Sequence, residues 1–147
     1  MKHLVWFILC VAWPVLAQTA TTNHFDTLKN SSWFAISGGF ANTTTAEANA
    51  VAAISRQTNA VAEFKRLLDE PGPAQNLYGL LGLHVLSAPE FKPALQSLLN
   101  SKTNVRVLGG CIVGEREVAE VARQIQNNQW NLPGQTVRGG KYGPNAD

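Results

Sequence analysis

Apolar residues recur every three or four positions along most of the chain, which is the spacing of a helix with one buried face. The clearest run comprises Val51, Ile54, Thr58, Val61, Phe64 and Leu68. Thr44 and Glu47 precede it three apart, as in a capping box, so a helix is predicted to begin near Thr45. Ser55 to Asn59 is rich in weak helix formers, and the pattern leaves open whether one long helix or two shorter ones fill the stretch.

The segment from Ala74 to Leu86 is apolar on every side of a helical wheel, which predicts a buried central helix. Gly79 and Gly82 lie three apart on one side, where the missing side chains would let a neighbouring helix approach closely. Ser87 to Glu90 is a further helix start signal, followed by the apolar stripe Phe91, Leu95, Leu98 and Leu99. A last amphipathic helix is predicted over Glu115 to Asn127, with the stripe Val118, Val121 and Ile125.

The segment from Val105 to Val113 fits two kinds of structure. Val105, Val107, Cys111 and Val113 alternate as in a strand, whereas Val105, Leu108, Cys111 and Ile112 fit one face of a helix. A repeat favours the helix, because Phe64-Lys-Arg-Leu-Leu68 and Leu95-Gln-Ser-Leu-Leu99 are offset by 31 residues. Each is followed by a polar break, a glycine-containing apolar segment and a charged amphipathic helix, as in stacked helical hairpins.

In this order of elements the chain resembles HEAT-type repeats over roughly Val61 to Gln126. In Asn76-Leu-Tyr-Gly-Leu-Leu-Gly-Leu83 and Gly110-Cys111 it is also similar to small exported bacterial proteins of unassigned function, a likeness that implies no activity. The fold class predicted is therefore all-α: a short HEAT-like stack of antiparallel helical hairpins with about five to six helices, between a flexible N-terminal leader and a flexible C-terminal tail.

Residues 1–17 have the pattern of a secretory signal peptide. Lys2 supplies positive charge, residues 4–12 are apolar, and Val15 and Ala17 suit a cleavage site after Ala17, with Ala20 as the alternative. The apolar stretch is shorter than the roughly 20 residues that span a bilayer. We expect a secreted or periplasmic protein without membrane insertion after cleavage, organised as a leader over 18–32, a helical domain over 33–130 and a tail over 131–147.

Removal of residues 1–17 leaves eleven basic and ten acidic side chains, and this balance argues against a nucleic-acid partner, which requires a basic face. Cys111 is the one cysteine that remains, so no intramolecular disulfide is expected. Residues 30–32 and 42–44 match the N-glycosylation acceptor pattern, and whether they are used stays open.

The candidate catalytic residues are Cys111 as a thiolate nucleophile and His84 as its base. Both stand in apolar surroundings, which favours the alternative of a small buried cysteine and a core histidine. No cofactor site is predicted, since no phosphate loop occurs. No metal site is predicted either, because His24 with Asp26 is the one close pair of ligand types, and Glu115, Glu117 and Glu120 alternate with arginines.

The function predicted from these patterns is that of an exported, non-catalytic protein-binding module with a protein partner, such as an inhibitor or immunity-type protein of the cell envelope. The alternative is a small cysteine-dependent enzyme that uses Cys111 and His84. A third possibility is a structural subunit that folds only within a larger envelope assembly.

Overall fold

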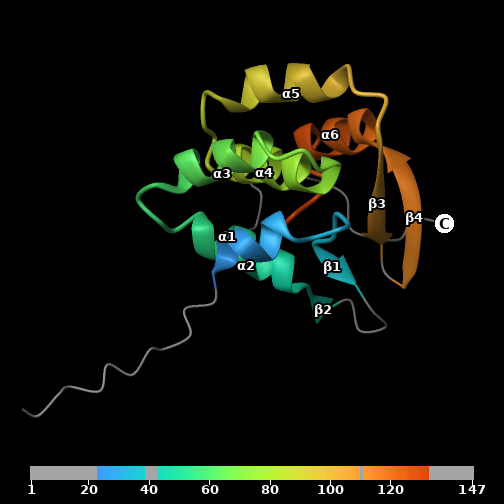
Figure 1. The fold of residues 1–147 in the computed structure, drawn as a ribbon, viewed down its shortest axis with the longest axis horizontal. Coiled ribbons are helices and arrows are strands. Elements are labelled where there is room, and N and C mark those ends of the chain that lie inside the picture. Colours follow the sequence, from blue (N-terminus) through green and yellow to red (C-terminus); the bar gives the residue numbers. More distant parts are fainter. Residues whose placement is uncertain (1–22, 39–42, 110, 133–147) are drawn as a thin grey trace, which may run out of the picture.

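The computed structural model describes residues 23–38, 43–109 and 111–132 (Figure 1). In chain order the elements are α1 (His24–Lys29), β1 (Ser37–Gly38), β2 (Thr43–Thr44), α2 (Ala46–Ile54), α3 (Ala60–Leu68), α4 (Pro73–Val85), α5 (Phe91–Leu99), β3 (Asn104–Gly109), β4 (Ile112–Glu117) and α6 (Val118–Gln126). The predicted signal peptide and the predicted tail from residue 133 onward lie outside the described residues. None of the helices within the described ranges combines the length and apolar character needed to cross a membrane.

The all-α prediction is wrong, because the described chain also forms two antiparallel two-stranded sheets, β1–β2 and β3–β4. The second sheet occupies the segment that we predicted as helix. Val105 and Val107 are 2% and 4% exposed whereas Arg106 between them is exposed, which is the alternation of a strand. β-branched valines also favour the pleated backbone. In the second copy of the 31-residue pattern the glycine-containing apolar segment is therefore β-structure between the helices α5 and α6, and α6 begins at Val118 rather than at Glu115.

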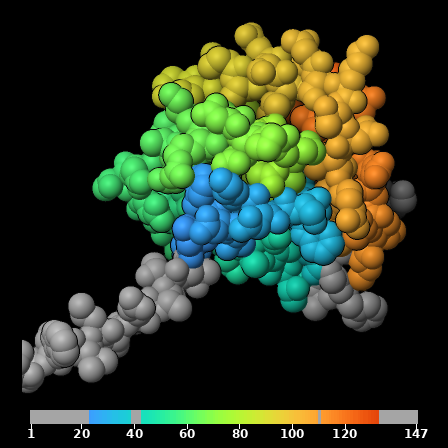
Figure 2. Space-filling view, viewed as in Figure 1, coloured from blue at the N-terminus to red at the C-terminus, as the bar shows by residue number. Residues whose placement is uncertain are grey.

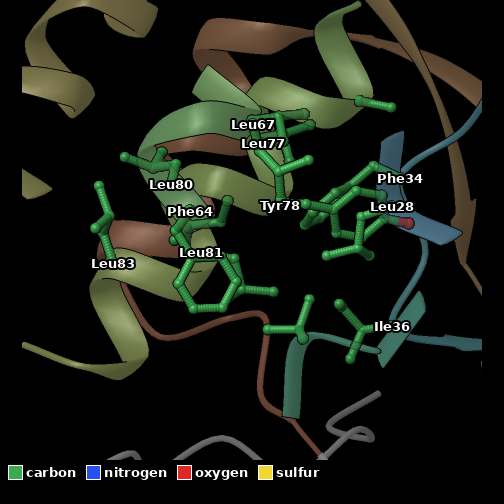
Figure 3. Close-up of a cluster of buried hydrophobic side chains, with 14 of the residues drawn as sticks. Leu28, Phe34, Ile36, Phe64, Leu67, Leu77, Tyr78, Leu80, Leu81 and Leu83 are labelled. Atoms are coloured by element: carbon green, nitrogen blue, oxygen red, sulfur yellow. The ribbon is translucent and has the colours of Figure 1, made fainter. Parts of the chain in front are cut away.

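The central helix α4 was predicted correctly. It packs against α3, α5, α6 and β3, and Leu77, Tyr78, Leu80, Leu81 and Leu83 are fully buried (Figure 3). A Cβ atom on Gly79 would lie 2.6 Å from the carbonyl oxygen of Phe64, and one on Gly82 would lie 2.2 Å from the Phe64 ring. The two glycines thus allow the close approach of α3, as expected from their spacing.

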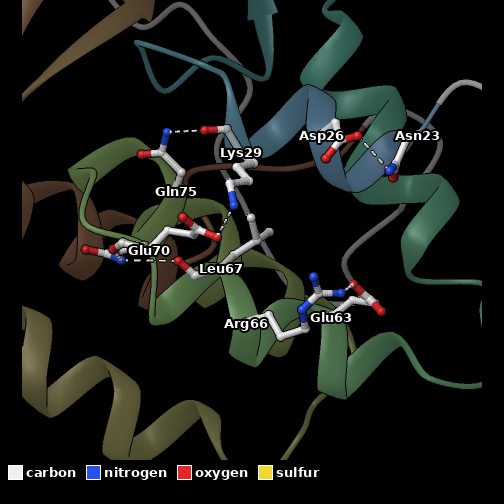
Figure 4. A network of polar contacts seen from close by, with 9 residues as sticks. Asn23, Asp26, Lys29, Glu63, Arg66, Leu67, Glu70 and Gln75 are labelled. Carbon is white, nitrogen blue, oxygen red and sulfur yellow. Dashed lines mark hydrogen bonds and ion pairs between the residues drawn. The ribbon is translucent and has the colours of Figure 1, made fainter.

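Helix α1 corrects the prediction of a flexible leader over its described part, residues 23–32. Leu28 is fully buried, and the Arg66 guanidinium lies 4.2 Å above the centre of the Phe25 ring. Lys29 forms an ion pair of 3.0 Å with Glu70, and Gln75 Nε2 donates to the Lys29 carbonyl at 2.6 Å (Figure 4). A helix of six residues is unstable alone, so these tertiary contacts are what order it.

The stretch from residue 46 to residue 68 forms two helices, α2 and α3, separated by the polar turn over residues 55–59. The helix start near Thr45 is confirmed, but the cap is Thr45 itself, whose Oγ1 accepts from the Ala48 amide at 3.1 Å. Glu47 accepts hydrogen bonds from Ser31 Oγ and Trp33 Nε1, each at 3.1 Å. The expected Thr44–Glu47 capping box is therefore replaced by a contact that fastens residues 31–33 to α2.

Candidate functional site

Cys111 and His84 lie in different parts of the structure. His84 is near the end of α4, with Nε2 2.8 Å from Asn128 Oδ1 and its ring against Phe91. Cys111 is exposed in the turn between β3 and β4, at the end of the hairpin away from α5 (Figure 1). The prediction of a buried Cys111 is wrong, because a turn that leaves the core exposes its side chains. No hydrogen bond among the described residues joins Cys111 to His84, so the pair required for the nucleophile hypothesis is not assembled.

The β3–β4 hairpin has two different faces, since side chains alternate along each strand. One face carries the cross-strand pairs Val105–Arg116, Val107–Gly114 and Gly109–Ile112, and the other carries Asn104–Glu117, Arg106–Glu115 and Leu108–Val113. Val105 and Val107 are buried, so the first face is turned toward the body of the protein. Its outer part, at Gly109, Ile112 and Gly114, extends beyond the buried valines and is open to solvent.

The inner edge of the hairpin is held by the segment around Phe34. The Phe34 amide donates to the Arg106 carbonyl at 2.8 Å, and the Leu108 amide donates to the Phe34 carbonyl at 3.1 Å. The buried Tyr78 hydroxyl supports this segment, because it accepts from the Ala35 amide at 2.9 Å and donates to the Trp33 carbonyl at 3.0 Å. Burial raises the pKa of Tyr78 well above its ordinary value. This tyrosine stays neutral and connects α4 to the base of the hairpin.

The outer edge of the hairpin is free within the described chain, where β4 pairs with β3 and with no other strand. Arg106 and Leu108 direct their backbone groups to Phe34. The hydrogen bonds between β3 and β4 are therefore formed by the residues at the odd-numbered positions of β3, 105, 107 and 109, with their partners on β4. Val113, Glu115 and Glu117 therefore direct their backbone N–H and C=O groups away from β3. The hairpin lies at the margin of the described residues (Figure 2), and among the described elements β4 contacts mainly β3 and α6.

A groove of about 420 Å³ lies over the outer part of the inward face. Its lining includes Val107, Gly109 and Gly114 from the inward face of the hairpin, together with Ile112 and Trp130. Ile112 is 75% exposed and Val113 is 43% exposed, and they are the two large apolar side chains that the described residues expose to this degree. An apolar hollow beside an exposed apolar strand is typical of a binding surface.

A chain of polar contacts fixes one side of the groove. Arg116 forms an ion pair of 2.7 Å with Glu120, and Gln124 Nε2 donates to the same carboxylate oxygen at 3.2 Å. Gln124 Oε1 in turn accepts from Trp130 Nε1 at 3.0 Å. The Trp130 ring also packs edge-to-face on Phe34, with centroids 4.9 Å apart. The indole is thereby held in one orientation before any ligand arrives, which lowers the entropy cost of binding.

Three other hollows in the described structure lack such a combination. One lies between α1 and α3 and is lined by charged side chains of both signs, one lies beside α3 near Glu90, and one lies beside His84 and Phe91. No group of three or more His, Cys, Asp or Glu side chains that could hold a metal ion occurs among the described residues. The two carboxylates Glu115 and Glu117 stand on β4 rather than on the helix that we predicted for them.

No family model, no curated protein and no solved structure matches this chain. Sequence reasoning missed the site because the 31-residue pattern favoured a helix over Val105 to Val113. The alternation of Val105, Val107 and Val113 was the signal that could have located it.

Proposed function

We propose that this chain is an exported, non-catalytic protein-binding module that takes up an extended segment of a partner protein as an additional strand along β4. The observation that carries the proposal is the outer edge of β4, which no strand among the described residues covers and on which Ile112 and Val113 are exposed. Such an edge is a template for strand addition, in which backbone hydrogen bonds supply affinity and alternate side chains supply specificity.

The composition of β4 favours selective strand addition over unspecific edge-to-edge aggregation. Natural edge strands avoid aggregation by carrying charge, and Glu115, Arg116 and Glu117 provide it in the second half of β4. The first half carries Ile112 and Val113 and has no such protection. The signal-peptide pattern of residues 1–17 supports action outside the cytoplasm, in the envelope or in the medium.

Two substitutions of one residue test the proposal. Glu115→Pro removes an amide that points outward, so it should block strand addition while it leaves the β3–β4 ladder bonds in place. Glu115→Ala is the matched control, because it removes the same carboxylate and retains the amide. Both variants should fold, which circular dichroism and thermal melts would verify.

The assay is affinity capture from envelope extract and culture supernatant with the purified wild type and both variants, followed by mass spectrometry. A partner retained by the wild type and, at equal or reduced yield, by Glu115→Ala but lost by folded Glu115→Pro would support strand addition at β4. Equal retention by all three proteins would show that β4 is not the binding edge, and an absence of any specific partner would count against the binding function itself.

A further inference from the structure

Gly109 and Gly114 are not required by the backbone or by packing within the described chain. Neither has a positive φ angle, and nothing lies within 4 Å of a Cβ atom built on either one. Gly79 and Gly82 are the contrast, since the same construction brings their Cβ atoms into contact with Phe64. Glycine inside a strand weakens it, and it often marks a place where a ligand or another backbone approaches closely. The two hairpin glycines keep the groove open.

The groove lies beside the β4 edge in such a way that one residue of an added strand would face it. On a strand added to β4, the residues opposite Ile112, Gly114 and Arg116 face the groove, because cross-strand neighbours share a face. The residue opposite Gly114 borders the hollow that Ile112, Gly114, Arg116 and Trp130 line, and Val107 lies on the far side of Gly114. A large ring fills a space left by a strand glycine, and an aromatic pair with Trp130 adds to the stability.

The opposite face of β4 favours basic side chains on an added strand. Val113, Glu115 and Glu117 lie there. Arg106 on β3 stands opposite Glu115, but neither carboxylate takes part in an ion pair among the described residues. Basic side chains opposite Glu115 and Glu117 would form favourable cross-strand pairs, and acidic ones would repel. Arg116 is already paired with Glu120, so it does not require an acidic side chain on the added strand.

We infer that the segment bound by β4 is an extended polypeptide with an aromatic side chain opposite Gly114 and basic side chains opposite Glu115 and Glu117. This inference rests on the proposed strand addition and names the chemistry of its partner. For an antiparallel strand it defines a probe, acetyl-Lys-Thr-Lys-Phe-Val-Thr-amide, whose residues in order lie opposite residues 117 to 112 of the chain. Its phenylalanine is the residue opposite Gly114.

The test measures binding of the fluorescein-labelled probe by anisotropy, together with a second peptide in which phenylalanine is replaced by alanine. The wild type should bind the phenylalanine peptide about 10-fold more tightly, the effect expected from burial of one ring. Gly114→Val should lower its affinity to that of the alanine peptide and leave the alanine peptide unchanged. A third peptide with glutamate in place of both lysines should bind more weakly than the first.

Gly114→Ala, which fills less of the hollow, is the second variant and should reduce the preference in part. Equal binding of the phenylalanine and alanine peptides by the wild type, with both lost in Glu115→Pro, would overturn the aromatic selection and leave strand addition standing. Binding that Glu115→Pro leaves intact, or no binding of any peptide at about 1 mM, would overturn strand addition at β4 itself.

Discussion

Replacement of Gly82 by alanine should destabilise the protein even though alanine is the better helix former. The added Cβ would lie 2.2 Å and 2.3 Å from two atoms of the Phe64 ring, whereas ordinary carbon contacts are about 3.5 to 4.0 Å. The ring or the helix must therefore shift by more than about 1 Å. Phe64 is fully buried, so it has no open space into which to move.

The magnitude follows from two opposed terms. Overpacking of a filled core costs about 1 to 3 kcal/mol and occasionally more, and the shift required here places Gly82→Ala at the upper end or beyond. The gain in helix propensity offsets about 1 kcal/mol. We expect a net loss of about 2 kcal/mol in the free energy of unfolding, which lowers the melting temperature by about 10 °C for a domain of this size.

Urea unfolding followed by tryptophan fluorescence, with thermal melts by circular dichroism, would measure the loss. Gly114→Ala is the control, since nothing in the described chain lies near its Cβ position and its stability should stay within about 0.5 kcal/mol of the wild type. Phe64→Leu should relieve the clash, so the double variant should be less destabilised than the sum of the single ones. A Gly82→Ala protein as stable as the wild type would refute the close α3–α4 contact.

Three further changes have defined outcomes. Tyr78→Phe leaves the buried Ala35 amide without its acceptor and should cost about 1 to 3 kcal/mol. Because burial raises the pKa of Tyr78, the folded state keeps a proton that the unfolded state loses above about pH 10. The free energy of unfolding of the wild type should therefore fall as the pH rises from there, by up to about 1.4 kcal/mol per pH unit. Urea unfolding at several pH values should show a shallower fall in Tyr78→Phe. Ser87 has a φ angle of 51° after the end of α4, where the Ala88 amide donates to the Leu83 carbonyl, so Ser87→Gly should raise the free energy of unfolding by about 0.5 to 1 kcal/mol; an unchanged or lowered value would contradict this. Cys111 should react with Ellman's reagent without unfolding, and Cys111→Ala should alter the stability by less than about 0.5 kcal/mol, whereas an inert native thiol would contradict its exposure.

The helices whose buried stripes lie within a single continuous segment were predictable from the sequence. The α4 pattern specified both its burial and the close contact at Gly79 and Gly82, because each follows from local spacing on one helix. The buried faces of α3 and α6 were predictable for the same reason, whereas the pattern left the break over residues 55–59 open. Here the local pattern and the tertiary structure favour the same conformation.

The candidate site was not predictable in this way. A short apolar run with glycines fits a helix and a strand equally well, so the local pattern of residues 105–113 does not choose between them. The strand is selected by pairing of β3 with β4 and with Phe34, which is distant from β3 in the sequence. Helix α1 is too short to form alone and depends on Glu70 and Gln75. The sequence by itself determined the buried helices, whose periodicity is local, whereas only the tertiary structure decided the hairpin, its free edge and its groove, because these depend on which distant segments meet.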